Sequence, residues 1–214
     1  MEGNWNRLLF VNLYNDETWE ELLPDEEWRN WIGGVGIGLR LYEKFGGRIE
    51  PFSPDNPLIL TTGPLTGSPF PNSGRHEIVS RSPQTGFFGE ANSGGFFGNE
   101  LKKAGYDGII VKGRADVPKV ITIDEHVRIE KRPELWGRDF YSLREELRKQ
   151  KKYSVLGIGR AGEKIKWPRN TVYNRLLGRR WILRIDSEEV VKCVVLKENI
   201  YHVLYRSLFY LLGK

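Results

Sequence analysis

The chain has 214 residues and a formal net charge of +5, a size that suits one large domain or two small ones around a hydrophobic core. Its single cysteine, Cys193, excludes a disulfide framework and any metal or cluster site built from several thiolates of this chain. The three histidines, His76, His126 and His202, are far apart without ligand spacing, so we expect ordinary surface or core residues.

Basic and acidic residues are unevenly distributed along the chain. Residues 1–130 carry 13 Lys/Arg against 19 Asp/Glu, whereas residues 131–214 carry 20 against 9. Such an excess can mark a nucleic-acid surface, but these basic residues are scattered among Leu, Ile, Val and Trp without a recognisable motif. Residues 1–14 are too polar for a signal peptide, and the apolar run at 200–212 is too short to span a bilayer. We therefore expect a cytoplasmic protein with no nucleic-acid or membrane partner, in which residues 200–212 form a docked helix.

The first third of the chain predicts strands and short helices. Strands are expected at residues 4–13, 17–23 and 58–62, the first two as a hairpin. Asp25 is the expected N-cap of one helix, and a second short helix is expected at residues 39–45. Between them, the glycine cluster at residues 33–38 is expected to interrupt the helices. It either lets the backbone approach a ligand or forms a loop packed against the first sheet.

Glycine and proline are concentrated in residues 63–105, around which the rest of the chain is arranged. This stretch ends in a predicted helix with Ser93 as its N-cap and Gly94 and Gly95 in its first turn. Such a helix start presents free amide groups and the positive end of the helix dipole, which suits a phosphate. Arg75 adds a planar cation for a phosphate or for the edge of a heterocycle. The alternative is a tight hairpin region with a buried helix.

Short apolar runs predict the remaining strands, at residues 77–81, 85–90, 108–112, 120–123, 127–131, 154–158 and 187–196. Ser142 opens a capping box for a helix that continues to about Lys151. Residues 157–162 match the dinucleotide fingerprint G-x-G-x-x-G, but Pro168 follows six residues later, where the fingerprint needs a helix. The surrounding elements are also hairpins, so we reject a nucleotide site there.

Four segments carry long, ordered motifs: residues 3–13, 55–67, 74–116 and 154–167. In these the chain resembles the N-terminal domain of the aldehyde ferredoxin oxidoreductase family. Members are tungsten (sometimes molybdenum) bis-pterin enzymes that oxidise aldehydes to carboxylic acids and pass electrons to ferredoxin. The resemblance covers about residues 1–166 and implies an α+β fold of two similar β-rich halves with short helices, on which the pterins rest. Residues 167–214 form a divergent basic and apolar tail, which a truncation or a shifted reading frame would explain.

The resemblance implies cofactor-binding roles for five residues of the central stretch. Arg75 is expected to contact a pterin. The A-N-S-G-G turn is expected to supply main-chain contacts, with Asn92 near the magnesium ion that links the terminal phosphates and Gly94 near a pterin phosphate. Ser93 and Gly95 complete this turn. None of the five is expected to act as a catalytic acid or base.

The chain also departs from the family pattern. The glycine-rich loop that makes a second main-chain contact to the cofactor is reduced, within residues 171–184, to Gly178-Arg179. A [4Fe–4S] cluster needs about four thiolates, whereas this chain offers Cys193, which we interpret as a buried or inert thiol. Three hypotheses remain: part of an oxidoreductase completed by a cluster-bearing subunit, a non-catalytic pterin-binding or scaffold subunit, or an inactive gene remnant. For the chain alone, the last two together are favoured over autonomous catalysis.

Overall fold

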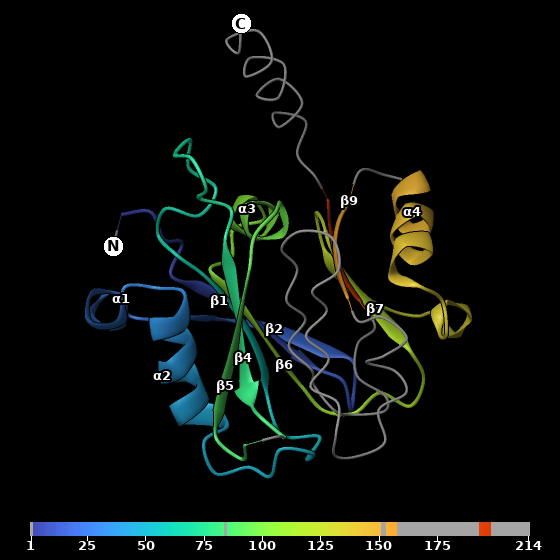
Figure 1. Ribbon diagram of the computed structural model, residues 1–214, viewed down its shortest axis with the longest axis horizontal. Helices are drawn as coiled ribbons and strands as arrows, with labels where there is room; N and C mark the ends of the chain where they lie inside the picture. Colours follow the sequence, from blue (N-terminus) through green and yellow to red (C-terminus); the bar gives the residue numbers. More distant parts are fainter. Residues whose placement is uncertain (1, 84, 151–152, 158–192, 198–214) are drawn as a thin grey trace, which may run out of the picture.

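The computed structural model describes residues 2–83, 85–150, 153–157 and 193–197 (Figure 1). Within these ranges the α-helices are α1 (Asp25–Trp31), α2 (Val35–Phe45), α3 (Phe97–Lys103) and α4 (Phe140–Gln150), with a short 3-10 helix at Pro133–Leu135. The strands are β1 (Arg7–Asn12), β2 (Glu17–Leu22), β3 (Leu58–Thr62), β4 (His76–Arg81), β5 (Phe88–Ser93), β6 (Gly108–Lys112), β7 (Lys119–Ile123), β8 (Val127–Lys131), β9 (Tyr153–Gly157) and β10 (Cys193–Lys197).

The described strands form two sheets. A six-stranded sheet has the order β2-β1-β6-β3-β4-β5, and a four-stranded sheet has the order β8-β7-β10-β9. In the larger sheet β1 and β6 are parallel and the other neighbours antiparallel, which gives a mixed sheet. The expected hairpin β1–β2 is present, and the strands expected at residues 120–123 and 127–131 also pair as an antiparallel hairpin, β7–β8. The predicted α+β class is confirmed, with two β-rich parts of unequal size.

The two sheets pack face to face, with α1 and α2 outside the larger sheet, α4 outside the smaller one and α3 at the upper end between them (Figure 1). Alternate residues of β1 divide between two cores: Leu8 and Phe10 pack beneath α1 and α2, whereas Leu9 and Val11 face the four-stranded sheet and α3. Burial on both faces explains why β1 is an unbroken apolar run. A third, smaller core lies between the outer face of the four-stranded sheet and α4, where Leu143 is buried.

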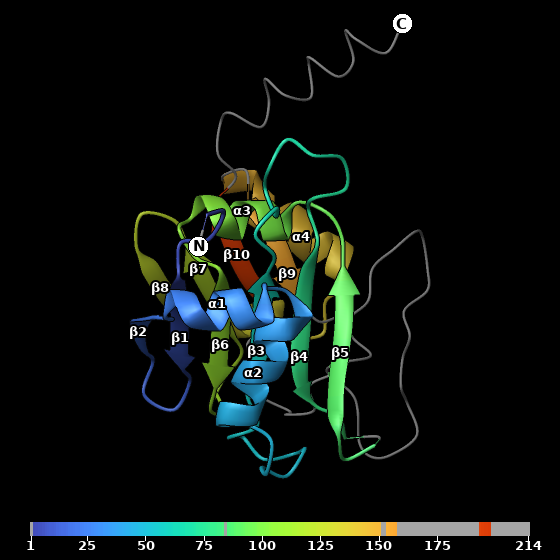
Figure 2. The same ribbon diagram turned by 90° about the vertical axis from the view of Figure 1, so that its left-hand side faces the viewer.

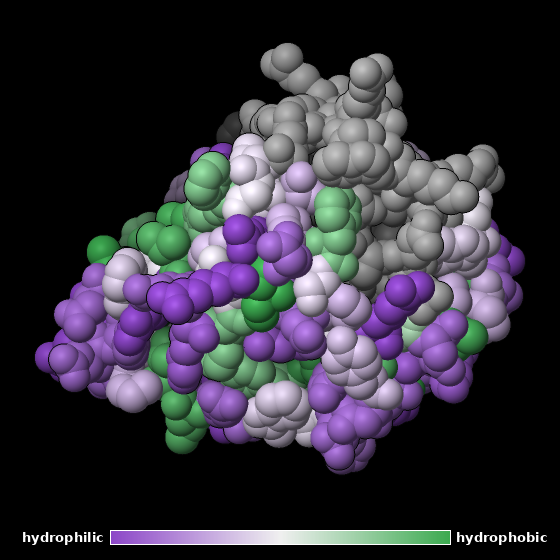
Figure 3. All heavy atoms as spheres, turned by 90° about the horizontal axis from the view of Figure 1, so that it is seen from below, coloured by the Kyte–Doolittle hydropathy of each residue, from purple (hydrophilic) through white to green (hydrophobic). Residues whose placement is uncertain are grey.

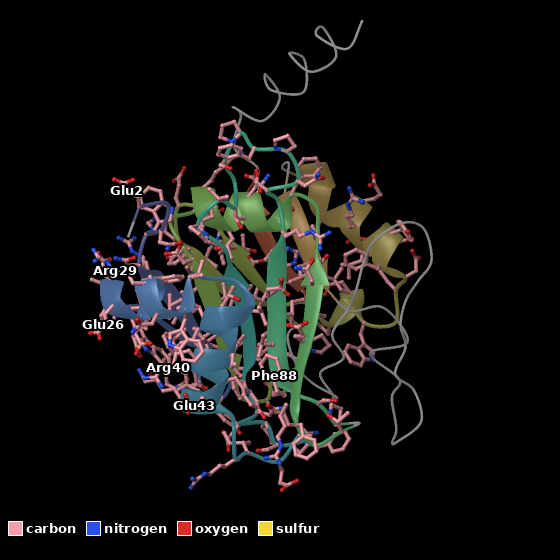
Figure 4. All side chains as sticks on the ribbon, turned by 60° about the vertical axis from the view of Figure 1, so that its left-hand side comes forward. Glu2, Glu26, Arg29, Arg40, Glu43 and Phe88 are labelled. Carbon is pink, nitrogen blue, oxygen red and sulfur yellow. The ribbon has the colours of Figure 1, made fainter. Side chains whose placement is uncertain are left out.

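Helices α1 and α2 cover the face of the larger sheet that turns toward the viewer in Figure 2. Trp28 of α1 and Leu41 of α2 are buried in that layer. On its outer side the Arg40 guanidinium binds both carboxylate oxygens of Glu27 at 3.0 Å, joining the two helices, and also pairs with Glu43 (Figure 4). This bidentate ion pair links α1 and α2 on the solvent side of the layer.

The glycine cluster at residues 33–38 interrupts the helices as predicted, but only at its start: α1 ends at Trp31, and the second helix begins earlier than the predicted residue 39. α2 begins at Val35 and includes Gly36 and Gly38. A Cβ on Gly36 would lie 2.2 Å from the Trp31 carbonyl oxygen, and one on Gly38 would lie 2.8 Å from Cγ2 of Val79. These glycines are needed because α2 packs so closely against α1 and β4, and the alternative of packing against the first sheet is therefore correct for Gly38.

The N-caps predicted for α1 and α4 are wrong. Asp25 is the first residue inside α1, and Pro24 occupies the cap position without a side-chain hydrogen bond. At α4 the cap is supplied by Asp139: its Oδ1 accepts a hydrogen bond from the Ser142 main-chain nitrogen at 3.0 Å. Its Oδ2 also accepts from the Ser142 hydroxyl at 2.6 Å. The carboxylate lies three residues before the amide that it caps, so Ser142 is the capped residue.

Several predictions fall on residues outside the described ranges. These are the docked helix at 200–212, most of the fingerprint at 157–162, the reduced loop at 171–184 and the side chain of Cys193. The domain boundary after residue 166 likewise stays a prediction. Of the helices that the structure describes, none combines the length and the apolar character needed to cross a bilayer.

Candidate functional site

One end of the six-stranded sheet gathers the segments that the sequence singled out. There β3 ends, β4 begins and β5 ends, and the loop of residues 63–75 projects beyond them at the top of Figure 2. α2 starts at the same end, because the Gly34 main-chain nitrogen donates to the carbonyl oxygen of Thr62 at 2.9 Å. A Cβ on Gly33 would lie 3.0 Å from Cδ of Pro64. Both glycine-rich segments therefore meet at one edge.

Ser93 is not a helix N-cap, contrary to the prediction. β5 runs through Ser93, which pairs with His76 at the end of the β4–β5 ladder. α3 begins at Phe97, and its cap position is taken by Phe96. The strand pairing outweighs the local capping preference of serine, so the predicted helix start becomes a loop at Gly94 and Gly95.

Gly94 and Gly95 border open space. A Cβ built on either glycine would meet no atom within 4 Å in the part of the chain that the structure describes. The same described residues provide no hydrogen-bond acceptor for the two main-chain amides. Gly95 also has φ +113°, a backbone conformation that residues with a side chain rarely adopt. The amides of this loop are therefore accessible, although they do not belong to a helix.

Nearby glycines differ, because the protein itself fills the space around them. A Cβ on Gly74 would lie 2.4 Å from the carbonyl oxygen of Gly95, and one on Gly98 would lie 3.1 Å from the carbonyl oxygen of Arg75. The Thr66 hydroxyl accepts from the Gly63 amide at 3.0 Å and donates to the Arg75 carbonyl at 3.1 Å. These contacts hold the loop of residues 63–75 against α3 and fix the backbone of Arg75.

Arg75 and Asn92, both predicted as site residues, are brought into contact. The Arg75 Nη1 donates a hydrogen bond to Oδ1 of Asn92, and Nδ2 of Asn92 donates to Oε1 of Glu77. Glu77 and Asn92 are directly opposite each other on β4 and β5. Sequence reasoning missed Glu77. Its two-residue spacing from Arg75 was the available signal, since residues i and i+2 of an extended chain lie on one face.

The carboxyl group of Glu77 lies in an unfavourable environment. Burial is the largest cause that raises the pKa of Glu77, and the nearby carboxylate of Glu90 raises it further. The hydrogen bond from Asn92 and the positive charge of Arg75 act in the opposite direction. The charged form of Glu77 therefore depends on Asn92 and Arg75 for its stabilisation.

The sequence predicted that His76 is an ordinary residue either of the surface or of the core, and the structure places it in the core. Its side chain is 2% exposed and packs against Phe97, with the ring centroids 5.2 Å apart. Neither ring nitrogen has a hydrogen-bond partner among the described residues. Burial lowers the pKa of His76 to about 4, so the ring is neutral at pH 7. His126 lies exposed after β7, and the described part of the chain contains no group of three or more His, Cys, Asp or Glu side chains arranged for a metal ion.

Comparison with known proteins connects this geometry to a family. The model of the aldehyde ferredoxin oxidoreductase N-terminal domain matches residues 8–174. The tungsten-containing aldehyde ferredoxin oxidoreductase of Pyrococcus furiosus is 41% identical over 170 residues, which cover 77% of this chain and 28% of that protein. The enzyme of the same name from Pyrococcus horikoshii is 38% identical over 206 residues, covering 92% of this chain and 34% of that protein.

Two further proteins, one compared by sequence and one by structure, are also similar to this chain. An aliphatic sulfonate oxidoreductase, WOR-like subunit, from Pyrococcus furiosus is 33% identical over 178 residues, which cover 73% of this chain and 28% of that protein. The solved active site complex BamBC of benzoyl coenzyme A reductase, in complex with 1,5-dienoyl-CoA, superposes with a TM-score of 0.82 at 26% identity. That alignment covers 92% of this chain and 31% of the other. The chain spans about a third or less of the length of these proteins. The family match over most of the chain shows that it belongs to the aldehyde ferredoxin oxidoreductase family, in the part that corresponds to the N-terminal domain.

Proposed function

We propose that this chain is the cofactor-binding base of a tungsten-containing oxidoreductase, which holds the pterins of a tungsten bis-pterin cofactor at the upper edge of the larger sheet in Figure 2. The observation that carries the proposal is the loop at Gly94 and Gly95, where main-chain amides have no acceptor among the described residues and a Cβ would meet nothing. The metal of the proposed cofactor is tungsten, or molybdenum, which some members of the family use instead.

The residues at this edge fit such a group. A pterin tail ends in a phosphate, and successive loop amides form a concavity that binds anions. Arg75 is exposed beside that loop and offers a planar set of donors, which suits a phosphate or the polar edge of a pterin ring. The open space over Gly94 and Gly95 lets a ligand approach the backbone closely. Both the hydrogen-bond donors and the open space around them therefore suit a pterin phosphate.

Each residue of the proposed site has a distinct task. The Arg75 guanidinium contacts a pterin, and the amides of Gly94 and Gly95 bind a terminal phosphate. Ser93 ends β5 and directs the chain into this turn. Asn92 has two tasks in the proposal, since its side chain binds Arg75 and its main chain would help to hold the magnesium ion of the cofactor. When bound, the metal–dithiolene centre supplies the redox chemistry, and the protein orients it.

The remaining parts of the reaction belong to a partner in this proposal. The relatives are about three times longer than the matched region, and this chain has one cysteine. A cluster-bearing subunit or further domains would therefore provide the [4Fe–4S] ligands, with ferredoxin as the electron acceptor. Oxidation of an aldehyde to a carboxylic acid, in the cytoplasm, is the activity that we assign to the assembled enzyme.

Exposed apolar side chains support a partner at the site end of the molecule. Those near the site are Trp5, Leu65, Phe70 and Phe96, all more than a third exposed. Trp5 is tied to this end because its indole nitrogen donates to the carbonyl oxygen of Lys102 at 2.7 Å. The opposite end is a mosaic of hydrophilic and hydrophobic side chains (Figure 3), and it also exposes Phe87 in the β4–β5 turn. Apolar residues gathered around a ligand site are typical of a surface that another domain covers.

The experiment that tests the proposal measures the cofactor directly. The full chain is purified anaerobically from a tungstate-fed host, and its tungsten, molybdenum and pterin contents are determined, with and without Arg75→Ala. We expect metal and pterin in fixed ratio and about a tenfold lower content in Arg75→Ala, the loss of roughly one charge-assisted contact. Arg75→Lys is the matched control, which keeps the charge without the planar fork.

The outcomes separate the three hypotheses. Bound metal–pterin with aldehyde-dependent dye reduction supports the enzyme portion, and metal–pterin without turnover supports a non-catalytic pterin-binding or scaffold subunit. The single cysteine favours the second outcome for the chain alone. A chain that folds but holds neither metal nor pterin, whether alone or co-expressed with a cluster-bearing relative, is an inactive remnant, and the proposal then fails.

A further inference from the structure

Three side chains form a relay from the surface of the site into the sheet. Arg75 donates a hydrogen bond to Asn92, and Asn92 donates one to Glu77, so each end of the Asn92 amide has a partner. Arg75 is exposed, whereas Glu77 is half-buried on β4 and directly opposite Asn92. The outer member of the relay is therefore placed to touch a ligand, and the inner member is not.

The two partners select one orientation of the Asn92 amide. An amide oxygen accepts hydrogen bonds and an amide nitrogen donates them, whereas a carboxylate accepts and a guanidinium donates. With Glu77 on the inner side, Nδ2 turns inward and Oδ1 turns outward to Arg75. Rotating the amide by a half turn would set donors against the guanidinium donors of Arg75 and remove both bonds.

Glu77 is costly in this position. Its Oε2 is buried and has no hydrogen-bond partner within the described ranges. Cγ of Glu77 approaches α2, at 3.7 Å from a Cβ built on Gly34, so the side chain is held between the helix start and the sheet. An unpartnered buried oxygen destabilises a fold, and an apolar side chain of similar shape would avoid that cost. Glu77 is therefore better explained by an effect on its neighbours than by a contribution to stability.

We propose that Glu77 is a positioning residue of the pterin site: it orients the Asn92 amide and, through it, holds the Arg75 guanidinium beside the open loop at Gly94. This inference rests on the proposed function, because Arg75 needs a fixed position only if it binds a ligand. The required property of Glu77 is an oxygen acceptor facing Asn92, and its negative charge is secondary. Replacements that keep or remove that oxygen therefore separate the two properties.

The test uses the full chain, purified from a tungstate-fed host, in four forms. Glu77→Leu removes the acceptor, Glu77→Gln keeps an acceptor oxygen with nearly the same shape, and Glu90→Gln removes a neighbouring charge that is exposed. Tungsten and pterin content, the melting temperature and a crystal structure are determined for these three variants and for the wild type, which is the fourth form. We expect Glu77→Leu to hold about tenfold less tungsten and pterin, the effect of losing roughly one oriented hydrogen bond.

Stability distinguishes positioning from a structural role. Glu77→Leu removes the unpartnered Oε2 but also leaves Nδ2 of Asn92 without its acceptor, so we expect this variant to melt near the wild-type temperature, with the Arg75 side chain moved away from Asn92 in its crystal structure. Glu77→Gln is expected to keep both the contact and the cofactor within about threefold of wild type. Glu90→Gln is expected to match the wild type. Equal cofactor content in all four forms overturns the inference, and so does a loss in Glu77→Leu that accompanies a lower melting temperature.

A failure of the proposed function gives a different result. If the wild type holds no tungsten or pterin, the crystal structures decide the inference without a ligand. Arg75 held against Asn92 in the wild type and Glu77→Gln, and displaced in Glu77→Leu, supports the positioning role. An Arg75 side chain in the same place in all of these structures overturns it.

Discussion

The two glycine clusters of this chain meet at the same end of the six-stranded sheet, yet they serve opposite purposes. At the start of α2, a Cβ on Gly36 would lie 2.2 Å from a carbonyl oxygen and one on Gly38 would lie 2.8 Å from a valine methyl group. After β5, a Cβ on Gly94 or Gly95 would meet no described atom within 4 Å. One cluster lets the protein pack against itself, and the other leaves room for something else.

This difference teaches how a glycine-rich segment should be interpreted. Glycine permits close approach, but the approaching atoms belong to the protein in one case and to a ligand in the other. A substitution by alanine tests each case separately. Where the protein fills the space, stability should fall and binding is irrelevant. Where the space is open, stability should hold and binding should fall.

The largest effect is expected for Gly36→Ala. In an ordinary helix this substitution is stabilising by about 0.5–1 kcal/mol. Here the added methyl group would overlap the Trp31 carbonyl oxygen, which belongs to the backbone and cannot rotate away. We expect a loss of more than about 3 kcal/mol, or failure to fold, because α2 must shift against α1. Urea unfolding followed by tryptophan fluorescence measures the change.

Gly47→Ala is the matched control at the other end of α2. A Cβ there would lie 3.6 Å from its nearest neighbour, the Glu43 carbonyl oxygen, which is an ordinary contact. We expect a change within about 0.5 kcal/mol. If Gly36→Ala proves as stable as Gly47→Ala, the close fit between α1 and α2 is not what requires glycine at position 36.

A second, smaller effect on stability is expected when the pH falls, because one face of β4 buries His76. Val79 packs toward α2, whereas His76 points toward α3 with both ring nitrogens unpaired among the described residues. Burial lowers the pKa of His76 to about 4, from an ordinary value of about 6.5. Between these values the unfolded chain binds a proton that the folded chain does not. Stability contributed by the neutral ring is therefore complete above about pH 6.5 and is lost as the pH falls toward 4, by roughly 3 kcal/mol.

Comparing unfolding free energies at pH 7 and pH 4.5 isolates this contribution. His76→Leu keeps an apolar contact with Phe97 and cannot be protonated, so its stability should fall less over this range than that of the wild type. His126→Gln, at an exposed site, should retain the wild-type pH dependence. An equal pH dependence in His76→Leu and the wild type would show that the buried ring does not titrate as described.

The sequence predicted much of the fold because its signals there are local. Short apolar runs bounded by turn residues mark β1, β3 and β6, and burial on both faces of the larger sheet explains their unbroken character. The family pattern likewise gave Arg75 and Asn92, which the structure brings into contact.

The wrong prediction at Ser93 and the missed roles of Gly36 and Glu77 share a cause, which is that another element of the fold decided the outcome, whereas the wrong caps at Asp25 and Ser142 are local errors in a helix boundary. Ser93 has the local preference of an N-cap, but pairing with His76 keeps it in β5. The carbonyl oxygen that demands a glycine at position 36 comes from the end of α1, and no helix propensity records it. Glu77 acquires its importance from Asn92, fifteen positions away, through the register of β4 and β5, which the hydrogen bond from the Ser82 amide to the Phe87 carbonyl oxygen continues beyond the strands.

The smallest effect on stability, and the most direct test of the comparison, is expected for Gly94→Ala. Its backbone is not in the left-handed region and the added methyl group meets no described atom, so stability should stay within about 0.5 kcal/mol of wild type. The methyl group would nevertheless occupy the space from which a phosphate reaches the loop amides. We expect tungsten and pterin content to fall about tenfold, roughly 1.4 kcal/mol of binding free energy.

Gly95→Ala and Gly86→Ala form a matched pair that separates strain from ligand exclusion. Both residues have positive φ, +113° and +73°, and a Cβ on either meets nothing within 4 Å among the described residues. Each substitution should therefore cost about 1 kcal/mol of stability through backbone strain. Gly86 lies at the other end of the β4–β5 hairpin, so its replacement should leave the cofactor content unchanged, whereas Gly95→Ala should lower it. Equal cofactor loss in both variants would mean that strain alone disturbs the site, and the open loop would then be a feature of the fold with no ligand to explain it.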